Sequence, residues 1–540
     1  MEEEAASSPP MRISATVRAL STALRGKREY GPAKSRANDG ERMFPEPEKL
    51  WFKESSAKNL RNRDFLSPCT MLNTFYVDGQ VPPCVLSRIL SLRGSGVLPV
   101  SEGGVVGEGL RVRVDRAAAF RSVLGEQRGL EDYLKPSTHR EASVSLSLGQ
   151  LRTILLADHM GALLRRQGFL VSFCPKLPED SDIIAFLGTL GVDWPTVSLS
   201  WTNEDGEQRM KEELEKHGGE WGRRESDGTV RINLTRVVQE QGLMGYDPSI
   251  GTCTVQQESV SHLAQLELAA SDCAVSPATV VHVASCQDEF RQQQVAMLWR
   301  ASGAAHTQRF LVCGPVKTPG SQLTAAQYLQ LRRDQMKEAS EMKYGDQVEG
   351  QSWDDIIRVM TSATVRFELL STVHTSPVTL DVHREGSVST KGPRGGVFVM
   401  YNCARLHTLF DSYERGVEKG TNPEGSELDF SALKEEGEWL LLFNYLIPFS
   451  ELLDQSGQAV DCEGAGSESD CFLCVPLQMC KFLVSLSKDF SSYYNRVHVL
   501  GEPLPHLFNQ MFCRLYLLRA LRELYHSALE TLNLPPVRQL

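Results

Sequence analysis

The stretch SLGQLRTILLAD, residues 147 to 158, reads as a tight loop that opens directly into a helix. Apolar residues continue at helical spacing, which predicts a helix from Gln150 to Gly168. The start of such a helix presents backbone N–H groups, and many proteins hold a phosphate there. No histidine, lysine or carboxylate stands at the loop, so the stretch indicates a phosphate-binding shape without an evident group for chemistry.

Short β-rich runs alternate with helical stretches around this segment, as in a parallel sheet covered by helices. The expected strands are ASVSLSL (142 to 148), FLVSFC (169 to 174), TVVHVASC (279 to 286) and RFLVCGPV (309 to 316). Residues 202 to 228 are charged and Gly-rich, which favours an exposed insertion outside the sheet. We therefore expect an α/β domain over residues 136 to 355.

Different patterns flank this domain. Residues 97 to 114 end in the alternating run LRVRV, which favours a β-hairpin within a small α+β domain from 49 to 135. Residues 356 to 540 are mostly helical, with apolar positions recurring from Met511 to Leu532. Residues 1 to 48 carry a basic stretch and are expected to be a mobile tail, with a mitochondrial leader as the alternative.

Composition limits the class of protein. The 540 residues have a net charge of −11, which argues against coating nucleic acid by bulk electrostatics but leaves room for a local basic surface. The thirteen scattered cysteines favour a reducing compartment. The apolar run at residues 439 to 449 is too short to cross a membrane.

Possible catalytic and metal sites have simpler interpretations. Cys471 and Cys474, with Cys462 and Cys480 nearby, could bind zinc, but apolar neighbours favour buried thiols. Two cysteines at strand ends could act as nucleophiles, Cys286 with Asp288 and His282, and Cys313 beside Gly314, yet such cysteines are most often core residues. No motif for a dinucleotide or S-adenosylmethionine is visible, so no cofactor and no metal are expected.

Three groups in the helical region combine bases with aromatic rings. Arginine offers forked donors to phosphate, and aromatic faces stack on unpaired bases. The alternative is a set of core helices, with the arginines of the last helix turned outward or paired with Glu523 and Glu530. The candidate RNA-binding residues are Tyr401, Arg405, Tyr494, Asn495, Arg496, Arg514, Arg519 and Arg522.

These segments resemble a known family. VFVMYNCARLHTLF (397 to 410), FSSYYNRVHVL (490 to 500) and the closing 514 to 540 resemble the DALR anticodon-binding domain of arginyl-tRNA synthetases. Residues 147 to 169 are similar to the synthetase stretch His-Val-Gly-His-Leu-Arg-Ser-Thr, and GVDWPT (191 to 196) to its Gly-Asp-Trp-Gly-Thr. The resemblance implies a class I synthetase Rossmann-like domain followed by a helical DALR bundle.

The departures from that family concern the reaction. Ser147 and Gln150 stand where the family has two histidines, on either side of the retained Gly149. The loop that should read Met-Ser-Thr-Arg-Lys-Gly is KTPGSQ, with Lys317 displaced. Removing one donor of transition-state charge typically costs about 10²- to 10³-fold in rate, so we expect a degenerate nucleotide site and no synthetase activity.

The whole arrangement is most similar to a non-catalytic relative of the arginyl-tRNA synthetases. The resemblance implies a cytoplasmic adaptor that recognises arginine tRNAs and presents them to a methyltransferase that forms 3-methylcytidine in the anticodon loop. An active arginyl-tRNA synthetase and a protein-only scaffold are the alternatives.

Overall fold

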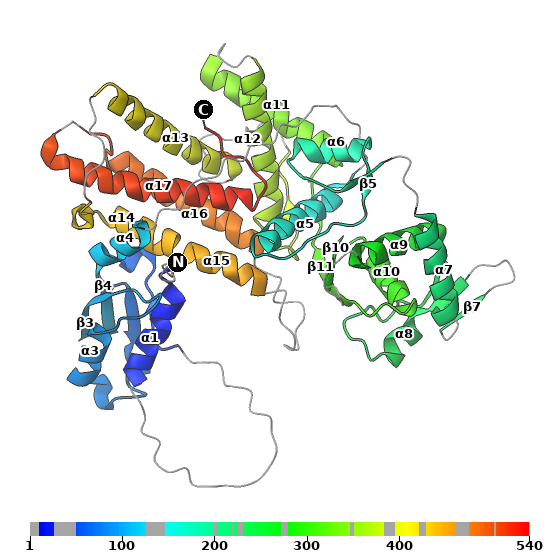
Figure 1. Cartoon of the computed structure of the whole chain (residues 1–540), viewed down its shortest axis with the longest axis horizontal. Coiled ribbons are helices and arrows are strands. Elements are labelled where there is room, and N and C mark those ends of the chain that lie inside the picture. The colour runs from blue at the N-terminus through cyan, green and yellow to red at the C-terminus, as the bar shows by residue number, and fades with distance from the viewer. Residues whose placement is uncertain are drawn as a thin grey trace, which may run out of the picture. The chain divides into compact units, whose positions relative to one another are not determined.

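The computed structural model shows a mixed α/β protein dominated by helices (Figure 1). It describes residues 10–25, 50–125, 146–198, 203–218, 221–224, 230–271, 279–345, 350–382, 395–420, 428–458, 475–501 and 504–538. The chain forms two compact units. The first contains Met1–Glu131, Leu406–Leu453 and Leu486–Leu524, and the second contains Asp132–Arg405, Asp454–Ser485 and Tyr525–Leu540.

The division into units differs from the expected consecutive domains. Helices α13 (Gly396–Glu418), α16 (Val475–Arg496) and α17 (Phe508–Glu530) each begin in one unit and end in the other. The expected border at residues 355 and 356 falls inside α12 (Gln351–Leu370), and the border at 135 lies outside the described residues. Long helices that contribute to two cores leave no composition change at which a sequence could be divided.

Helix α1 (Ile13–Arg25) corrects the expected mobile tail at residues 1 to 48. Val17, Leu20 and Leu24 recur at helical spacing and are buried in the core of the first unit. The basic residues that suggested a tail leave this apolar face intact, because Arg18 and Arg25 are exposed. The remaining residues up to 49, apart from 10 to 12, lie outside the described part of the chain.

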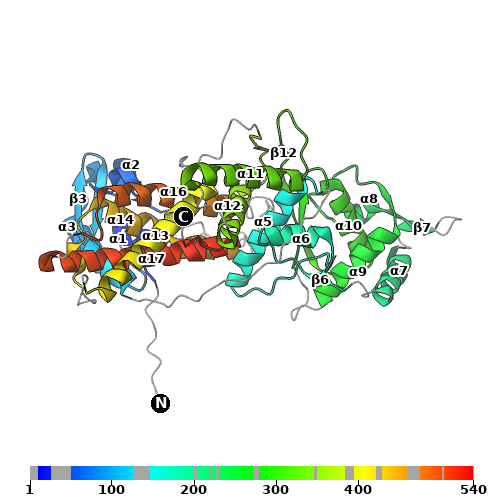
Figure 2. The ribbon, with the colours of Figure 1, turned by 90° about the horizontal axis from the view of Figure 1, so that it is seen from above.

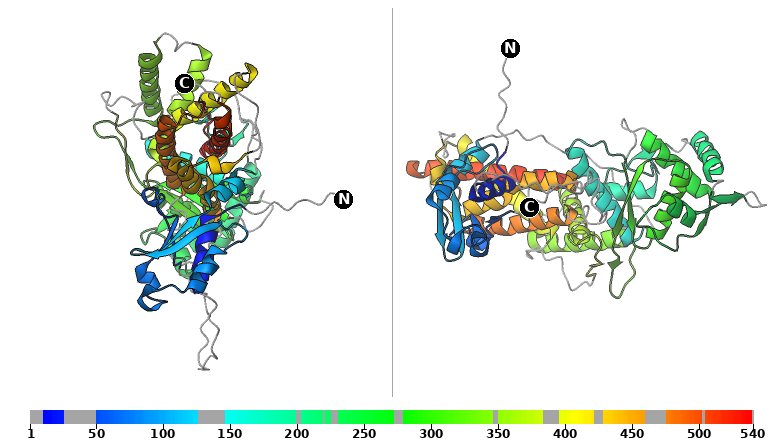
Figure 3. Two further views of the ribbon diagram at one scale, coloured as in Figure 1. Left: turned by 90° about the vertical axis from the view of Figure 1, so that its left-hand side faces the viewer. Right: turned by 90° about the horizontal axis from the view of Figure 1, so that it is seen from below.

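A four-stranded antiparallel sheet forms the rest of the N-terminal region, with α1 against it (Figure 3). The predicted hairpin over residues 97 to 114 is confirmed by the pairing of its two strands, β3 and β4. The strand order is β1 (Lys53–Glu54), β2 (Phe65–Pro68), β4 (Gly109–Val114) and β3 (Val100–Val106). Short helices α2 (Cys69–Leu72), α3 (Pro83–Leu90) and α4 (Arg116–Leu124) complete it.

The N-terminal sheet shares its core with helices from much later in the chain. Phe65 packs edge-on against Phe443 at 5.5 Å between ring centroids, and Phe120 against Trp439 at 5.8 Å. Buried Asp64 accepts hydrogen bonds from the Trp439 indole and the Val114 amide, both at 2.8 Å. Aromatic contacts and a satisfied buried carboxylate fix this packing.

The α/β part of the second unit contains the predicted parallel strands β10 (Thr279–Ser285) and β11 (Thr307–Cys313). Helix α10 (Glu289–Ala301) connects them, and α5 (Leu148–Arg166) confirms the predicted helix at the opening stretch. Shorter parallel pairs join β5 (Leu177–Pro178) to β6 (Thr196–Val197) and β12 (Val316–Lys317) to β13 (Val378–Thr379). Helix α6 (Asp182–Thr189) lies between β5 and β6 in the chain.

One expected strand is absent, and another lies mostly outside the described residues. Residues 169–174 are irregular, because the Phe173 ring stacks on Trp194 at 5.0 Å and faces Gly161, where a Cβ would lie 2.5 Å from the ring. Of the expected strand at 142 to 148, residues up to 145 are outside the described part and Ser147 caps α5. At residues 169–174, packing of the Phe173 ring overrides the β-rich pattern.

The expected insertion at residues 202 to 228 is less exposed than its charge indicated. It contains α7 (Glu204–Gly218), whose Met210 and Leu214 are buried in a core with α8 (Leu234–Glu240) and α9 (Gln257–Ser271). Strand β7 (Gly222–Arg224) pairs with β8 (Val230–Asn233), and β8 pairs with β9 (Thr252–Thr254). This sheet is separate from β10 and β11, as predicted.

Helices make up most of the remaining chain (Figure 2). Helix α11 (Ala325–Tyr344) packs beside α12, and the predicted apolar repeat after Met511 is confirmed as α17. The run at 439 to 449 spans α14 (Glu436–Leu441), a π-helical turn (Leu442–Leu446) and the start of α15 (Ile447–Gln458). Among the described helices, none is long and apolar enough to span a bilayer.

Candidate functional site

The start of α5 is closed by Ser147 and Gln150, the two residues that the sequence resemblance matches to the family's histidines. The Ser147 hydroxyl accepts from the Gln150 amide at 3.2 Å, and the Gln150 side-chain carbonyl accepts from the Ser147 amide at 3.0 Å. This reciprocal pair is a capping box, which satisfies N–H groups at a helix start. A Cβ on Gly149 would lie 3.7 Å from Ser285, an ordinary contact, so packing there does not demand glycine.

The segment after β11 is joined to this helix start. Thr324 and Gln327 form a second capping box at the start of α11, and Thr324 bridges to Ser147. The Ala325 amide donates to the Leu146 carbonyl at 2.8 Å. Lys317, the base displaced from the synthetase loop pattern, lies in β12 and pairs with Thr379 of β13. The two helix starts that flank the expected nucleotide site are thus tied to each other.

Arg152, one turn into α5, has a structural role that the sequence analysis missed. Its buried guanidinium donates to the carbonyls of Gly314 at 2.8 Å, Ser376 at 2.9 Å and Leu369 at 3.1 Å, with further bonds to Thr372 and Val373. It therefore caps the end of α12 and joins it to the end of β11. The sequence signal for this role was a single arginine on an otherwise apolar helix face.

The alternative catalytic groups do not assemble into a nucleophile and base. Burial lowers the pKa of His282 to about 4, and its ring nitrogens contact Gln308 and Gln292 at 2.9 and 2.8 Å. Burial raises the pKa of the Cys313 thiol to about 11, and Asp288 accepts from Ser285 at 2.6 Å. The thiol of Cys313 is protonated and both ring nitrogens of the neutral His282 are occupied, so neither group has the activation that nucleophilic catalysis needs.

The possible zinc ligands fall mostly outside the described residues, where Cys462, Cys471 and Cys474 lie. Cys480 is described and is buried within α16. Burial raises the pKa of its thiol to about 12, which disfavours the thiolate that zinc requires.

Tyr401 and Arg405, the first predicted RNA-binding pair, lie together on α13. The Arg405 guanidinium carbon lies 4.8 Å from the Tyr401 ring centroid, and its nitrogen lies 3.4 Å from the Tyr401 hydroxyl. Lys343, at the end of α11, brings a second cation to the same ring, with its ammonium 5.0 Å from the centroid. All three side chains are at least partly exposed. Lys343 is a basic residue of this group that the sequence did not indicate.

The second predicted group lies at the end of α16. Tyr494 is partly exposed and packs edge-on against buried Phe490 at 5.7 Å, while Asn495 and Arg496 are exposed. The Arg496 guanidinium donates to the Ser492 carbonyl at 3.1 Å, one turn earlier on the helix. The polar side chains of Asn495 and Arg496 are exposed, so a ligand can reach this group.

The three arginines of α17 differ in their surroundings. Arg514 donates to fully buried Glu438 at 2.8 Å, so the structure pairs it with neither Glu523 nor Glu530, the partners expected for this helix. Arg519 lies 5.6 Å from the Tyr516 ring centroid, and Arg522 lies 4.4 Å from that of Phe410. Arg514 is thus engaged inside the protein, whereas the other two stack on rings at a partly exposed surface.

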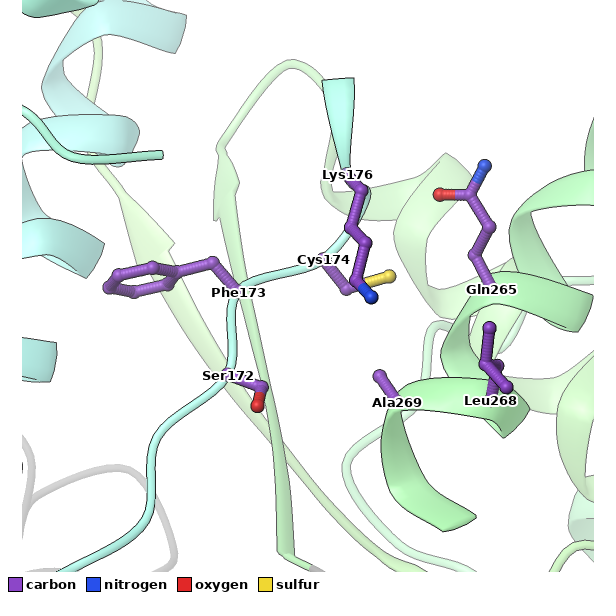
Figure 4. Close-up of a pocket in the computed structure, with 7 residues that line it drawn as sticks. All are labelled: Ser172, Phe173, Cys174, Lys176, Gln265, Leu268 and Ala269. Carbon is purple, nitrogen blue, oxygen red and sulfur yellow. The ribbon is translucent and has the colours of Figure 1, made fainter. Parts of the chain in front are cut away.

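A small pocket lies elsewhere in the second unit, between the segment before β5 and helix α9 (Figure 4). Its volume is about 50 Å³, and Phe173, Cys174, Lys176 and Gln265 are among its lining residues. Ligand pockets generally have roughly 300 Å³ or more, so this one is too small for a nucleotide.

Comparisons with known proteins agree with these observations. The family model for the DALR N-terminal domain matches residues 11–130, and that for the DALR anticodon binding domain matches residues 399–540. Arginyl-tRNA synthetase from Thermus thermophilus has a similar fold, with a TM-score of 0.57 at 15% identity over 98% of this chain and 100% of that one. The synthetase from Plasmodium falciparum gives 0.56 at 10% identity over 91% and 94%.

These structural matches confirm the predicted fold class, a class I synthetase-like α/β fold with a helical DALR region. Two relatives carry the name DALR anticodon-binding domain-containing protein 3. The protein from Danio rerio is 64% identical over the full length of both chains, and that from Mus musculus is 42% identical over 90% of this chain and 95% of the relative. The chain therefore belongs to the DALR anticodon-binding domain-containing protein 3 family.

Proposed function

We propose that this protein is a non-catalytic adaptor that binds arginine tRNAs and presents them to a methyltransferase, which forms 3-methylcytidine in the anticodon loop. The DALR anticodon binding domain and the synthetase-like fold support a tRNA-binding role. The methyl donor and the catalytic residues belong to the partner enzyme in this proposal. The tRNA and methyltransferase identities come from the family resemblance.

The observation that carries the non-catalytic part is the capping box of Ser147 and Gln150. Both side chains satisfy the first turn of α5, and neither carries positive charge at neutral pH. A class I synthetase fold needs donors that stabilise charge developing on the α-phosphate of ATP. Here the side chains at the equivalent place bond to their own helix, which supports loss of amino-acid activation.

The RNA contacts in this proposal come from the exposed or partly exposed candidates. Tyr401 with Arg405, the end of α16 and the ring-stacked Arg519 and Arg522 combine cations with aromatic faces. Such groups contact phosphates and unpaired bases. A local site of this kind is compatible with the overall charge of −11, because screened contacts act within about 10 Å.

A cytoplasmic location is part of the same proposal. Nine cysteines in the described part of the chain are free thiols, and Cys84 and Cys286 among them are exposed. Free exposed thiols persist in a reducing compartment.

Two assays test the proposal against its alternatives. Arginine- and tRNA-dependent ATP–pyrophosphate exchange by the pure protein would establish a synthetase and reject the adaptor. Addition of the protein to a tRNA 3-methylcytidine methyltransferase should increase methylation of arginine tRNAs and leave other substrates of that enzyme unchanged. Equal methylation with and without the protein, at concentrations that saturate tRNA binding, would reject the adaptor role.

A further inference from the structure

Lys343 occupies an unusual position at the end of α11, in contact with two tyrosine rings. Its ammonium lies 4.5 Å from the ring centroid of Tyr344 and 5.0 Å from that of Tyr401, and it contacts the Tyr344 hydroxyl at 2.5 Å. Among the described residues, no carboxylate forms an ion pair with this ammonium. Aromatic rings attract a cation without neutralising it, so the positive charge stays available to an anion.

Arg405 adds a second cation, stacked on Tyr401 at 4.8 Å. Lys343 and Arg405 thus approach one tyrosine from two helices, α11 and α13. Two cationic groups at one ring form a local electropositive point on a chain whose net charge is negative.

Trp353 extends the aromatic surface from the start of α12. Its ring centroid lies 5.1 Å from that of Tyr344, with 46° between the ring planes. Both rings are partly exposed, and α11 and α12 lie side by side (Figure 2). We call Lys343, Tyr344, Trp353, Tyr401 and Arg405 the aromatic–cation corner. Three of its members precede residue 399, where the match to the anticodon binding domain begins.

We propose that the aromatic–cation corner binds an unpaired stretch of RNA, with a base against the Tyr344 and Trp353 rings and backbone phosphates at Lys343 and Arg405. This inference rests on the proposed tRNA-binding function and adds a contact from α11 and α12. The base faces of a double helix are stacked on each other, so only an unpaired nucleotide offers a face to these rings. An acidic peptide would pair with the two cations but would leave both rings without a partner.

The test compares binding of two RNA probes, an anticodon stem–loop from an arginine tRNA and a blunt duplex of the same length. Tyr344→Ala should weaken stem–loop binding about tenfold, since stacking of one base on a ring contributes about 1–3 kcal/mol. Tyr344→Trp should keep it near the wild-type value. Lys343→Gln should weaken binding about fivefold and reduce its salt dependence, as loss of one phosphate contact does.

Matched controls lie on the same helix. Met342→Ala removes an exposed side chain beside the corner, and Lys337→Gln removes an exposed lysine that lies 3.9 Å from Glu341. Both controls should bind the stem–loop like the wild type. The thermal unfolding curves of all four alanine or glutamine variants should coincide with that of the wild type, which separates binding from folding.

The possible outcomes are distinct. Suppose that the wild type binds arginine tRNA, and that Tyr344→Ala and Lys343→Gln bind the stem–loop as well as the wild type does. The aromatic–cation corner is then rejected as an RNA site, while the proposed function stands. If the wild type binds no tRNA, the proposed function and the RNA site at the corner are both rejected. If the variants weaken binding of the stem–loop and of the duplex equally, the site does not select unpaired bases. If polyglutamate displaces RNA from the wild type but not from Tyr344→Ala, the corner binds an acidic peptide, which also contradicts an unpaired-base site.

Discussion

Ser147 and Gln150 bond to each other across the first turn of α5, at 3.0 and 3.2 Å. This relationship gives a structural role to both residues, which the sequence resemblance matches to the histidines of the synthetase family. The first turn keeps its shape through its own side chains, so the fold can persist without a bound nucleotide.

The capping box predicts a measurable stability contribution. Ser147→Ala removes the acceptor for the Gln150 amide and should lower the free energy of unfolding by about 1 kcal/mol. Ser147→Asp, which supplies another good cap, should lie close to the wild type. Urea unfolding followed by circular dichroism measures both, and equal stability of the alanine variant and the wild type would contradict the role of the cap.

Restoring the histidines should not restore the reaction. A Ser147→His, Gln150→His double variant still lacks the basic loop, because Lys317 is held in β12 by its pairing with Thr379. We expect no arginine-dependent ATP–pyrophosphate exchange from the variant or the wild type, with an active arginyl-tRNA synthetase as positive control. ATP–pyrophosphate exchange by the double variant would contradict this expectation, because it would mean that the segment after β11 can still support amino-acid activation.

Arg152 should be among the most sensitive positions of the second unit. Arg152→Met leaves the buried carbonyls of Gly314 and Leu369 and the partly buried carbonyl of Ser376 without their donor, at a cost of about 3 kcal/mol or more. The matched control is Arg166→Met on the same helix, whose exposed pair with Glu530 contributes less than about 1 kcal/mol. Similar unfolding curves for the two variants would contradict the structural role of Arg152.

His282 predicts a specific pH dependence of stability. Burial holds its folded-state pKa at about 4, below the value near 6.5 of an unfolded histidine. As pH falls from about 6.5 towards 4, the unfolded state takes up a proton that the folded state does not, so stability is lost. The wild type should lose about 1.2 kcal/mol more than His282→Gln between pH 6 and 5. Parallel pH profiles would show that His282 is accessible to protons in the folded state.

The Tyr401 and Arg405 pair should matter for RNA and little for folding. Tyr401→Ala and Arg405→Ala should each weaken binding to arginine tRNA by about tenfold or more, since each removes a cation–ring contact and a partner for RNA. Arg415→Ala on the same helix, an exposed arginine that bonds the Asp411 carbonyl at 3.1 Å, is the control. Fluorescence anisotropy with labelled tRNA measures the affinities, and equal binding by all variants would reject the site.

The sequence predicted elements whose signal is local. Apolar spacing located α5 and α17, and β-rich runs located β4, β10 and β11. It failed where a local signal was misleading: basic residues hid the buried face of α1, and the β-rich residues 169–174 are irregular because Phe173 packs on Trp194.

The candidate site was predictable only within single segments. Tyr401 and Arg405 are four residues apart on one helix, so their proximity follows from helical spacing. Lys343 and Trp353 meet the same surface from other helices, and Glu438 pairs with Arg514 across 76 residues. Such contacts depend on how helices pack, which one sequence without relatives does not reveal.

We propose above that this synthetase-like chain recognises arginine tRNAs without carrying out the synthetase reaction. Sequencing of small RNAs that co-purify with the wild type and with a Tyr401→Ala, Arg405→Ala variant from the same cells tests it most directly. Arginine tRNAs should be enriched over the cellular pool with the wild type, and this enrichment should be lost in the variant. No enrichment of any tRNA with the folded wild-type protein would contradict it.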